Sequence, residues 1–155
     1  MTFTRRTLAL ATAAFLYPLG VVAAPPEQTA PIRFEADLSA DEQSAPTESP
    51  GIGHAEFTLE RATLKFSWVV TFDKLTSPLT QAVVRGPQKP GTNAGVLFEL
   101  GPATAKSPIK GSIVINDGQL EYLLAGRMYV NLHTTKWKDG ELRGQIHRIR
   151  EKPKS

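Results

Sequence analysis

Three histidines are the first candidates for chemistry in this chain, because it contains no cysteine and an imidazole combines metal-binding nitrogen atoms with titration near neutral pH. They are His54, His133 and His147, and each falls on the polar side of an alternating segment. If these segments adjoin in the fold, the three imidazoles could hold copper or zinc. The alternation does not require such a cluster. We therefore expect no cofactor and a surface or hydrogen-bonded His133, with copper or zinc as the alternative.

Polar side chains around His133 form a second candidate. They alternate with apolar residues along residues 127–134, which places them on one face of a strand. Two interpretations stay open. An Arg85–Glu141 ion pair could fix the register of the strands, or the arginines and their neighbours could form a pocket for an anion or carboxylate; we favour the ion pair. The predicted polar-face site comprises Arg85, Tyr129, Asn131, His133, Glu141 and Arg143.

The sequence contains no motif of a nucleophilic or phosphate-transferring enzyme. It has no cysteine, no Gly-x-Ser-x-Gly turn and no phosphate-binding glycine loop. Its one pair of adjacent acids, Asp41 and Glu42, lies in a segment rich in Ser, Pro and Gly that is typical of a loop. These observations favour a non-catalytic protein over an enzyme.

The elements that must position these side chains are predicted to be strands. Alternation is strongest over residues 54–60 and 64–73, where Trp68 falls on the inward face. Shorter strand signals recur as far as residue 149, and Asp117 can cap a short helix that ends at Gly126. We therefore predict an all-β domain: an antiparallel β-sandwich or flattened Greek-key-like barrel of about eight strands with one short helix.

The first 23 residues have the pattern of a secretory signal peptide. Arg5 and Arg6 precede an uncharged apolar run, and small residues lead to a cleavage position after Ala23. We expect export to the periplasm or the extracellular space, by the general or the twin-arginine route; an uncleaved anchor is the alternative. No later stretch is long and apolar enough to span a membrane. The predicted divisions are 1–23 signal peptide, 24–31 flexible leader, 32–149 β domain and 150–155 basic tail.

The charge of the mature chain does not suggest nucleic-acid binding. The whole chain has a formal net charge of +3, and two of its basic residues are Arg5 and Arg6 of the predicted signal peptide. Residues 31–60 are strongly acidic and residues 127–155 are strongly basic. We interpret this asymmetry as a first and a last strand that lie near each other, in preference to a basic tail that seeks an anionic partner.

Five segments of the chain occur in a characteristic order: residues 55–72 around Ser67-Trp68, 86–94, 107–112, 123–134 and 140–146. In this order and spacing they resemble the CHRD (chordin-type) domain family, which is found in bacterial exported proteins and in the developmental protein chordin. They cover nearly all of residues 53–147. The resemblance implies a β-sandwich-like module and implies no settled reaction.

One departure from the family concerns metal ligands. Family members usually carry His-Ile-His before the Gly-Pro pair, where this chain has Val83-Val84-Arg85. With the histidine that corresponds to His133, the family pair could supply three imidazoles to copper or zinc, which would resemble copper–zinc superoxide dismutase at the level of fold. Val83 has no ligand atom, and Arg85 would place a fixed positive charge against a cation.

The sequence thus predicts an exported, non-catalytic CHRD-like binding or structural module. Its expected partner is a protein or an extracellular polymer, met at an exposed loop or sheet edge. The alternative is a copper- or zinc-binding or superoxide-dismutase-like protein that uses the remaining histidines.

Overall fold

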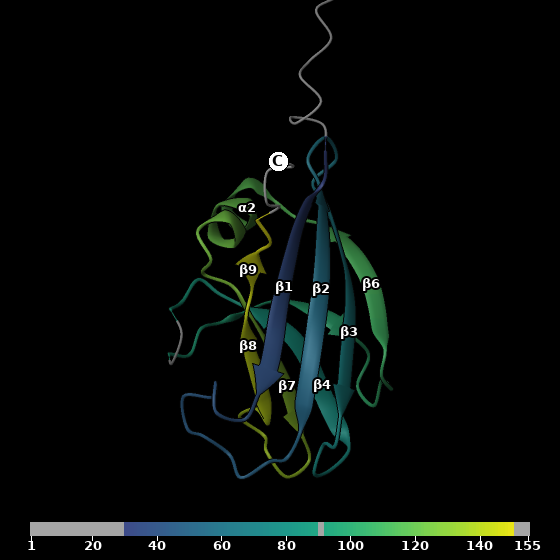
Figure 1. Cartoon of the computed structure of the whole chain (residues 1–155), viewed down its shortest axis with the longest axis vertical. Helices are drawn as coiled ribbons and strands as arrows, with labels where there is room; N and C mark the ends of the chain where they lie inside the picture. The colour runs from purple at the N-terminus through teal and green to yellow at the C-terminus, as the bar shows by residue number, and fades with distance from the viewer. Residues whose placement is uncertain (1–29, 90–91, 151–155) are drawn as a thin grey trace, which may run out of the picture.

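The computed structural model describes residues 30–89 and 92–150 of the chain. The predicted signal peptide, most of the predicted leader and residues 151–155 of the predicted tail lie outside these residues. The elements follow in this order (Figure 1): β1 (Ile32–Ser39), β2 (Ile52–Glu60), β3 (Lys65–Asp73), β4 (Leu79–Arg85), β5 (Val96–Gly101), β6 (Ile109–Val114), α2 (Asp117–Leu124), β7 (Tyr129–Thr134), β8 (Leu142–Gln145) and β9 (His147–Arg148).

Eight strands form one antiparallel sheet that curls until its two edges nearly meet. Their order is β5-β4-β7-β8-β1-β2-β3-β6, and the short β9 pairs with β1. The edge strands come together where Gly101 of β5 lies against Ile109 of β6. Across the same seam, Trp68 Nε1 on β3 donates to Leu100 O on β5 at 2.9 Å. The predicted all-β fold, a flattened barrel with one short helix, is confirmed.

Apolar side chains of alternate strand positions fill the inside of the barrel. Phe57 and Phe66 stack with ring centroids 5.0 Å apart, and Trp68 stacks on Phe98 at 5.8 Å. Trp68 is only 7% exposed, so its predicted place in the core is confirmed. Gly111 on β6 has no room for a Cβ against the Trp68 ring, which is how this strand lies close to the indole.

The short helix α2 begins one residue earlier than predicted, with Asn116 as its N-cap. Asn116 Oδ1 accepts from Gln119 N at 2.9 Å, while Gln119 Oε1 accepts from Asn116 N at 3.1 Å. This reciprocal capping box satisfies two backbone donors at once, and it leaves Asp117 as a first-turn acid. Gly126, with φ of 66°, follows the C-cap as the sequence predicted.

The last predicted strand is divided into two. Ile146 separates β8 from β9; it is fully buried, and its backbone N–H donates to Met128 O at 2.9 Å. β8 pairs with β7, whereas β9 pairs with β1. Ser39 lies opposite Arg143 and Glu35 opposite His147, so the predicted adjacency of the first and last strands is confirmed.

The two ends of the barrel differ in what covers them. Helix α2, the β2–β3 turn and the described chain ends lie at one end, and the loops after β1, β3 and β7 lie at the other (Figure 1). No helix among the described residues is long and apolar enough to cross a membrane.

Candidate functional site

The polar side of β7 is buried, although it faces away from the core. Tyr129, Asn131 and His133 are 0%, 2% and 4% exposed. In the register of the sheet, Arg85 of β4 lies opposite Tyr129 and Arg143 of β8 lies opposite Asn131. We call these five side chains the polar layer. The structure therefore brings together five of the six residues of the predicted polar-face site.

Two loops cover the polar layer and bond to it. From the β1–β2 loop, Gln43 Nε2 donates to Asn131 Oδ1 at 2.8 Å. From the β4–β5 loop, Ala94 N donates to Tyr129 Oη at 2.9 Å, and Ala94 O accepts from Arg85 Nη1 at 2.8 Å. Loop backbone needs partners once it is removed from water, and these side chains provide them. The polar layer thus holds loops in place.

Arg143 is a buried cation without an acidic partner in the described part of the chain. It is 1% exposed, its guanidinium lies 3.7 Å from the centre of the Tyr129 ring, and its Nη2 donates to Lys89 O at 3.3 Å. Its Nη1 has no hydrogen-bond partner among the described residues. Burial lowers the pKa of Arg143, although an arginine stays charged in proteins. Stacking on Tyr129 is therefore its principal compensation for burial.

His133 has both ring nitrogens occupied. Nδ1 lies 2.7 Å from Lys138 O, so Nδ1 carries the proton and donates to this carbonyl oxygen. Nε2 then accepts from Arg85 Nη2 at 3.5 Å. Burial lowers the pKa of His133, and the charge of Arg85 lowers it further, against the opposing effects of Lys138 O and Asp139. His133 is thus a neutral, hydrogen-bonded histidine, as the default expectation had it.

Glu141, the sixth predicted residue, lies apart from Arg85, and the predicted ion pair between them is wrong. Glu141 precedes β8 and is fully buried; its Oε1 accepts from Ser49 Oγ at 2.6 Å and from Thr76 N at 2.7 Å. Its Oε2 accepts from Thr134 Oγ1 at 2.6 Å. Burial alone would raise the pKa of Glu141, but these hydrogen bonds outweigh it and hold the pKa below its ordinary value. The carboxylate therefore links the β1–β2 loop, the β3–β4 loop and the end of β7.

The three histidines do not form a cluster. His54 Nδ1 on β2 lies 2.7 Å from Asp37 Oδ1 of β1, and both side chains reach solvent. His147 is exposed on β9, whereas His133 is enclosed in the polar layer. Over residues 30–89 and 92–150, no three His, Cys, Asp or Glu side chains are placed to hold a metal ion.

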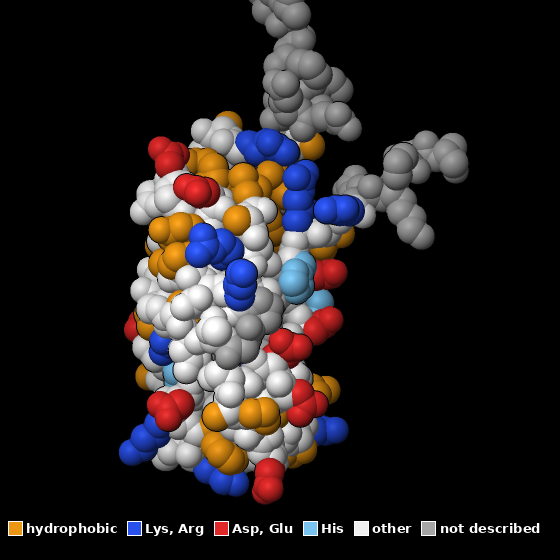
Figure 2. All heavy atoms as spheres, turned by 90° about the vertical axis from the view of Figure 1, so that its left-hand side faces the viewer, with side chains coloured by type: hydrophobic (Ala, Val, Ile, Leu, Met, Phe, Trp, Pro, Cys, Tyr) orange, Lys and Arg blue, Asp and Glu red, His pale blue; other side chains and the backbone are white. Residues whose placement is uncertain are grey.

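A cleft of about 860 Å³ opens at the end of the barrel near α2. Figure 2 shows an apolar patch at this end, with basic side chains along one side and acidic side chains close to the other. The patch is aliphatic and comes from β1, from α2 and from the segment after β9. Among the described residues, the cleft lining also includes four arginines, one histidine and no acid. We call it the end cleft, and it is lined by Ala30, Pro31, Ile32, Arg33, Arg61, Leu123, Leu124, Ala125, Gly126, His147, Arg148, Ile149 and Arg150.

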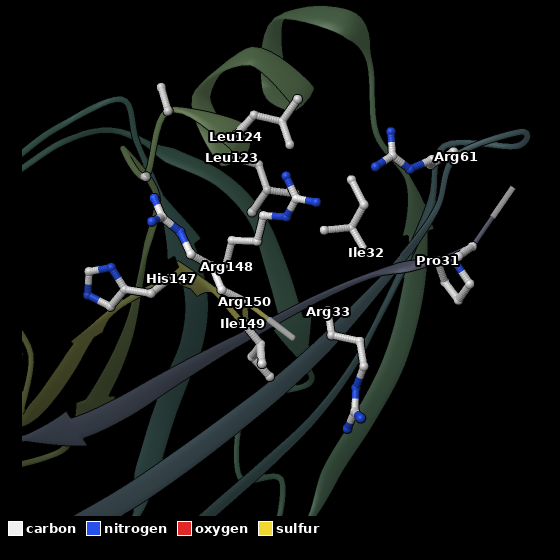
Figure 3. A pocket seen from close by; sticks show the side chains of 13 residues that line it. Pro31, Ile32, Arg33, Arg61, Leu123, Leu124, His147, Arg148, Ile149 and Arg150 are labelled. Carbon is white, nitrogen blue, oxygen red and sulfur yellow. The ribbon is translucent and has the colours of Figure 1, made fainter. Parts of the chain in front are cut away.

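Three of these arginines turn toward the hollow. In Figure 3, Arg148 and Arg150 extend from the end of β9 toward the helix, and Arg61 approaches from the β2–β3 turn. Arg33 and His147 point away from it. Arg148 lies opposite the inward-facing Phe34 of β1, so it leaves β9 on the side that faces the barrel interior.

Sequence reasoning missed the end cleft. Its cationic and apolar residues come from a turn, a helix and the last strand, so no local motif joins them. The spacing of Arg148 and Arg150 was a usable signal, but the predicted boundary assigns Arg148 to the β domain (32–149) and Arg150 to the basic tail (150–155).

The comparison with known families identifies the family of this domain. A family model described as the CHRD domain matches residues 34–146. This range includes most of β1, all of β2 to β8 and helix α2. The chain belongs to the CHRD domain family. Neither the curated proteins nor the solved structures contain a significant match to it.

Membership of the CHRD family makes the departure at residues 83–85 meaningful. Val83 lies opposite Asn131, and Arg85 contacts His133, so the two positions share a face with His133 as the resemblance implied. Val83 is fully buried and offers no ligand atom. The guanidinium of Arg85 occupies the neighbourhood of His133 Nε2, the nitrogen that a metal would need. The residues of this CHRD domain therefore do not fit a copper or zinc ion at this place.

Proposed function

We propose that this CHRD domain is an exported, non-catalytic binding module and that it binds an anionic partner at the end cleft. The observation that carries the proposal is the lining of the cleft, in which the described residues are arginines and one histidine around aliphatic side chains, with no acid among them. Such a lining has a positive potential that favours anions and repels cations.

The reactive residue types support a binding role over catalysis. His133 donates from Nδ1 and accepts at Nε2, and Glu141 accepts three hydrogen bonds. A general base needs a free lone pair within reach of a substrate proton. In this chain those lone pairs are engaged by the protein itself, which fits a structural role.

The position of the end cleft also supports binding. Arg61, Arg148 and Arg150 are exposed, and Leu124 keeps 49% of its surface exposed although it is a large apolar residue. Exposed apolar surface rimmed by charge is typical of interaction sites. A partner that covers Leu124 would remove this surface from water and neutralise the arginines together.

The test compares two charge-reversed variants of the mature chain, residues 24–155. Arg148→Glu/Arg150→Glu changes the end cleft, and Lys106→Glu/Lys110→Glu makes the same change in net charge at exposed sites near the start of β6, at the opposite end of the barrel. On immobilised dextran sulfate at low salt, we expect the wild type and the lysine variant to bind and the arginine variant to elute at once. Equal loss in both variants would contradict the proposal, because binding would then follow net charge alone.

Elemental analysis of untagged protein from the exported fraction tests the copper and zinc alternative. About one bound metal per chain, lost in His133→Ala, would favour that alternative over the proposed one. N-terminal sequencing of the same sample tests export: a chain that begins at Ala24 agrees with the proposed signal peptide, and a chain that begins at Met1 contradicts it.

A further inference from the structure

The chemical composition of the end cleft restricts its ligand further. Over the part of the chain that the structure describes, its lining side chains are aliphatic, cationic or imidazole, with no hydroxyl, no side-chain amide and no aromatic ring other than His147. Sites for sugars or peptide backbones need neutral donors and acceptors that fix orientation. This cleft has arginines for charge and aliphatic groups for apolar contact, and little else.

We propose that the end cleft binds an anionic amphiphile: a molecule with one alkyl chain and a phosphate, sulfate or carboxylate headgroup. This inference rests on the proposed function and names its ligand class. The alkyl chain lies along Ile32, Leu123 and Leu124, and the headgroup pairs with Arg148, Arg150 or Arg61.

The apolar half of the site is a recess in the surface. Ile32 is 6% exposed and Leu123 is 2% exposed, yet both line the cleft, so they form its floor. Leu124 is 49% exposed and stands at its edge. In Figure 3 the three aliphatic side chains face one another across the hollow between β1 and α2. A recess of this kind receives a single chain, whereas a bilayer surface is met by protruding apolar groups.

The volume agrees with a discrete ligand. Small-molecule sites in proteins enclose about 300–1,000 Å³, and the end cleft measures about 860 Å³. The cationic half supplies the specificity, because guanidinium groups bind phosphate, sulfate and carboxylate oxygens in a bidentate manner. A cationic or neutral amphiphile would leave these arginines without compensation.

The experiment is calorimetric titration of the mature chain, residues 24–155, with monododecyl phosphate below its micelle concentration. We expect one molecule per chain. Binding should tighten about two-fold for each methylene added between octyl and dodecyl phosphate. This is half the free energy of burying a methylene completely, because the cleft is open and leaves part of the chain in water. Inorganic phosphate and dodecyl maltoside should each bind at least ten-fold more weakly, since each has only one half of the ligand.

Variants locate the site. Arg148→Glu/Arg150→Glu should weaken dodecyl phosphate binding at least ten-fold, and Leu124→Asn should weaken it about three-fold without a change in fold, because Leu124 is exposed. Lys106→Glu/Lys110→Glu should leave it unchanged. Unaltered far-ultraviolet circular dichroism at saturation would show that binding does not unfold the chain.

Several outcomes would overturn the inference. Equal affinity for inorganic phosphate and dodecyl phosphate would mean a site for the anion only. Binding that both arginine and leucine variants retain would place the ligand elsewhere. If dodecyl phosphate fails to bind while dextran sulfate still binds through Arg148 and Arg150, the proposed function stands and the ligand class is wrong. A dimer of the wild type that Arg148→Glu/Arg150→Glu abolishes would make a second copy the occupant.

Discussion

The polar layer and the end cleft use similar residues in opposite ways. In the polar layer, Arg143 is 1% exposed and stacks on Tyr129, and Arg85 donates to Ala94 O from the covering loop. In the end cleft, Arg148 and Arg150 are exposed at the rim of an apolar recess. The arginines of the polar layer contact other residues of the chain, whereas those of the end cleft are exposed to solvent.

This difference shows that residue type alone does not identify a functional site. Histidine, tyrosine and arginine on one strand face look like a reactive site, yet loops of the same chain occupy most of their donors and acceptors; Arg85 Nε and Arg143 Nη1 are exceptions among the described residues. Buried polar groups that are fully hydrogen-bonded specify one arrangement of the backbone. The exposed residues of the end cleft include ordinary arginines and a leucine, and these are available to a ligand.

The first prediction concerns removal of the buried carboxylate of Glu141. Glu141→Ala should destabilise the protein by about 3 kcal/mol, because Ser49 Oγ, Thr76 N and Thr134 Oγ1 would lose their acceptor in a buried place. Chemical denaturation followed by circular dichroism measures this loss. Glu48→Ala is the matched control, since Glu48 is an exposed acid on the same loop as Ser49. A loss below 1 kcal/mol for Glu141→Ala would mean that the carboxylate does not hold these segments.

The second change is Arg143→Met, which keeps an unbranched side chain over Tyr129 and removes the buried charge. The cation–π contact and the hydrogen bond to Lys89 O are lost, while the unfavourable burial of a charge is relieved. We expect a net destabilisation of about 1 kcal/mol.

Amide hydrogen exchange should also report a local effect of Arg143→Met. The described residues of the β4–β5 loop should exchange faster, because Arg143 no longer holds Lys89. Dodecyl phosphate binding should be unchanged. Weaker binding in this variant would mean that the polar layer and the end cleft act as one site.

Sequence reasoning predicted the strands well, because alternation depends on local chemistry. Trp68, Phe57 and Phe66 lie in the core where the period of two placed them. It also grouped Arg85 with His133 correctly, since strand pairing carries both to one face. The burial of that face was not predictable, because the covering loops have no periodic signal and their path depends on the whole fold.

Two further errors have the same cause. Glu141 was assigned to a strand face with Arg85, but β8 begins one residue later, so the carboxylate turns toward Thr134 and Thr76. The end cleft was missed because Arg61 and Arg148 are far apart in sequence and meet only when the barrel closes. Local patterns determine which side chains share a strand face, but long-range packing determines what lies above that face.

The third prediction concerns pH. The pKa of His133 in the folded protein lies below the ordinary histidine value of 6.5, so the unfolded state takes up protons first as the pH falls. His133 therefore stabilises the fold above about pH 6.5 and loses this contribution as the pH falls toward its folded pKa. Arg85 and Asp139 are the charges that act on this imidazole, together with the carbonyl of Lys138.

His133→Asn isolates this effect, because an asparagine amide can still donate to Lys138 O and does not titrate. Between pH 7 and pH 5, the melting temperature of the wild type should fall more steeply than that of the variant. Glu141 does not confound this range, since its lowered pKa places its own loss of stability at more acidic pH. Parallel pH profiles for the two proteins would show that His133 does not titrate with unfolding.

The smallest expected effect on stability completes the comparison. Arg148→Glu/Arg150→Glu should change the free energy of unfolding by no more than about 0.5 kcal/mol, because surface substitutions away from packed contacts have little influence on folding. The same variant should lose ligand binding, whereas Arg143→Met loses stability and keeps binding. If Arg148→Glu/Arg150→Glu instead unfolds the protein as Glu141→Ala does, the rim arginines hold the barrel end together, and the distinction between the two regions fails.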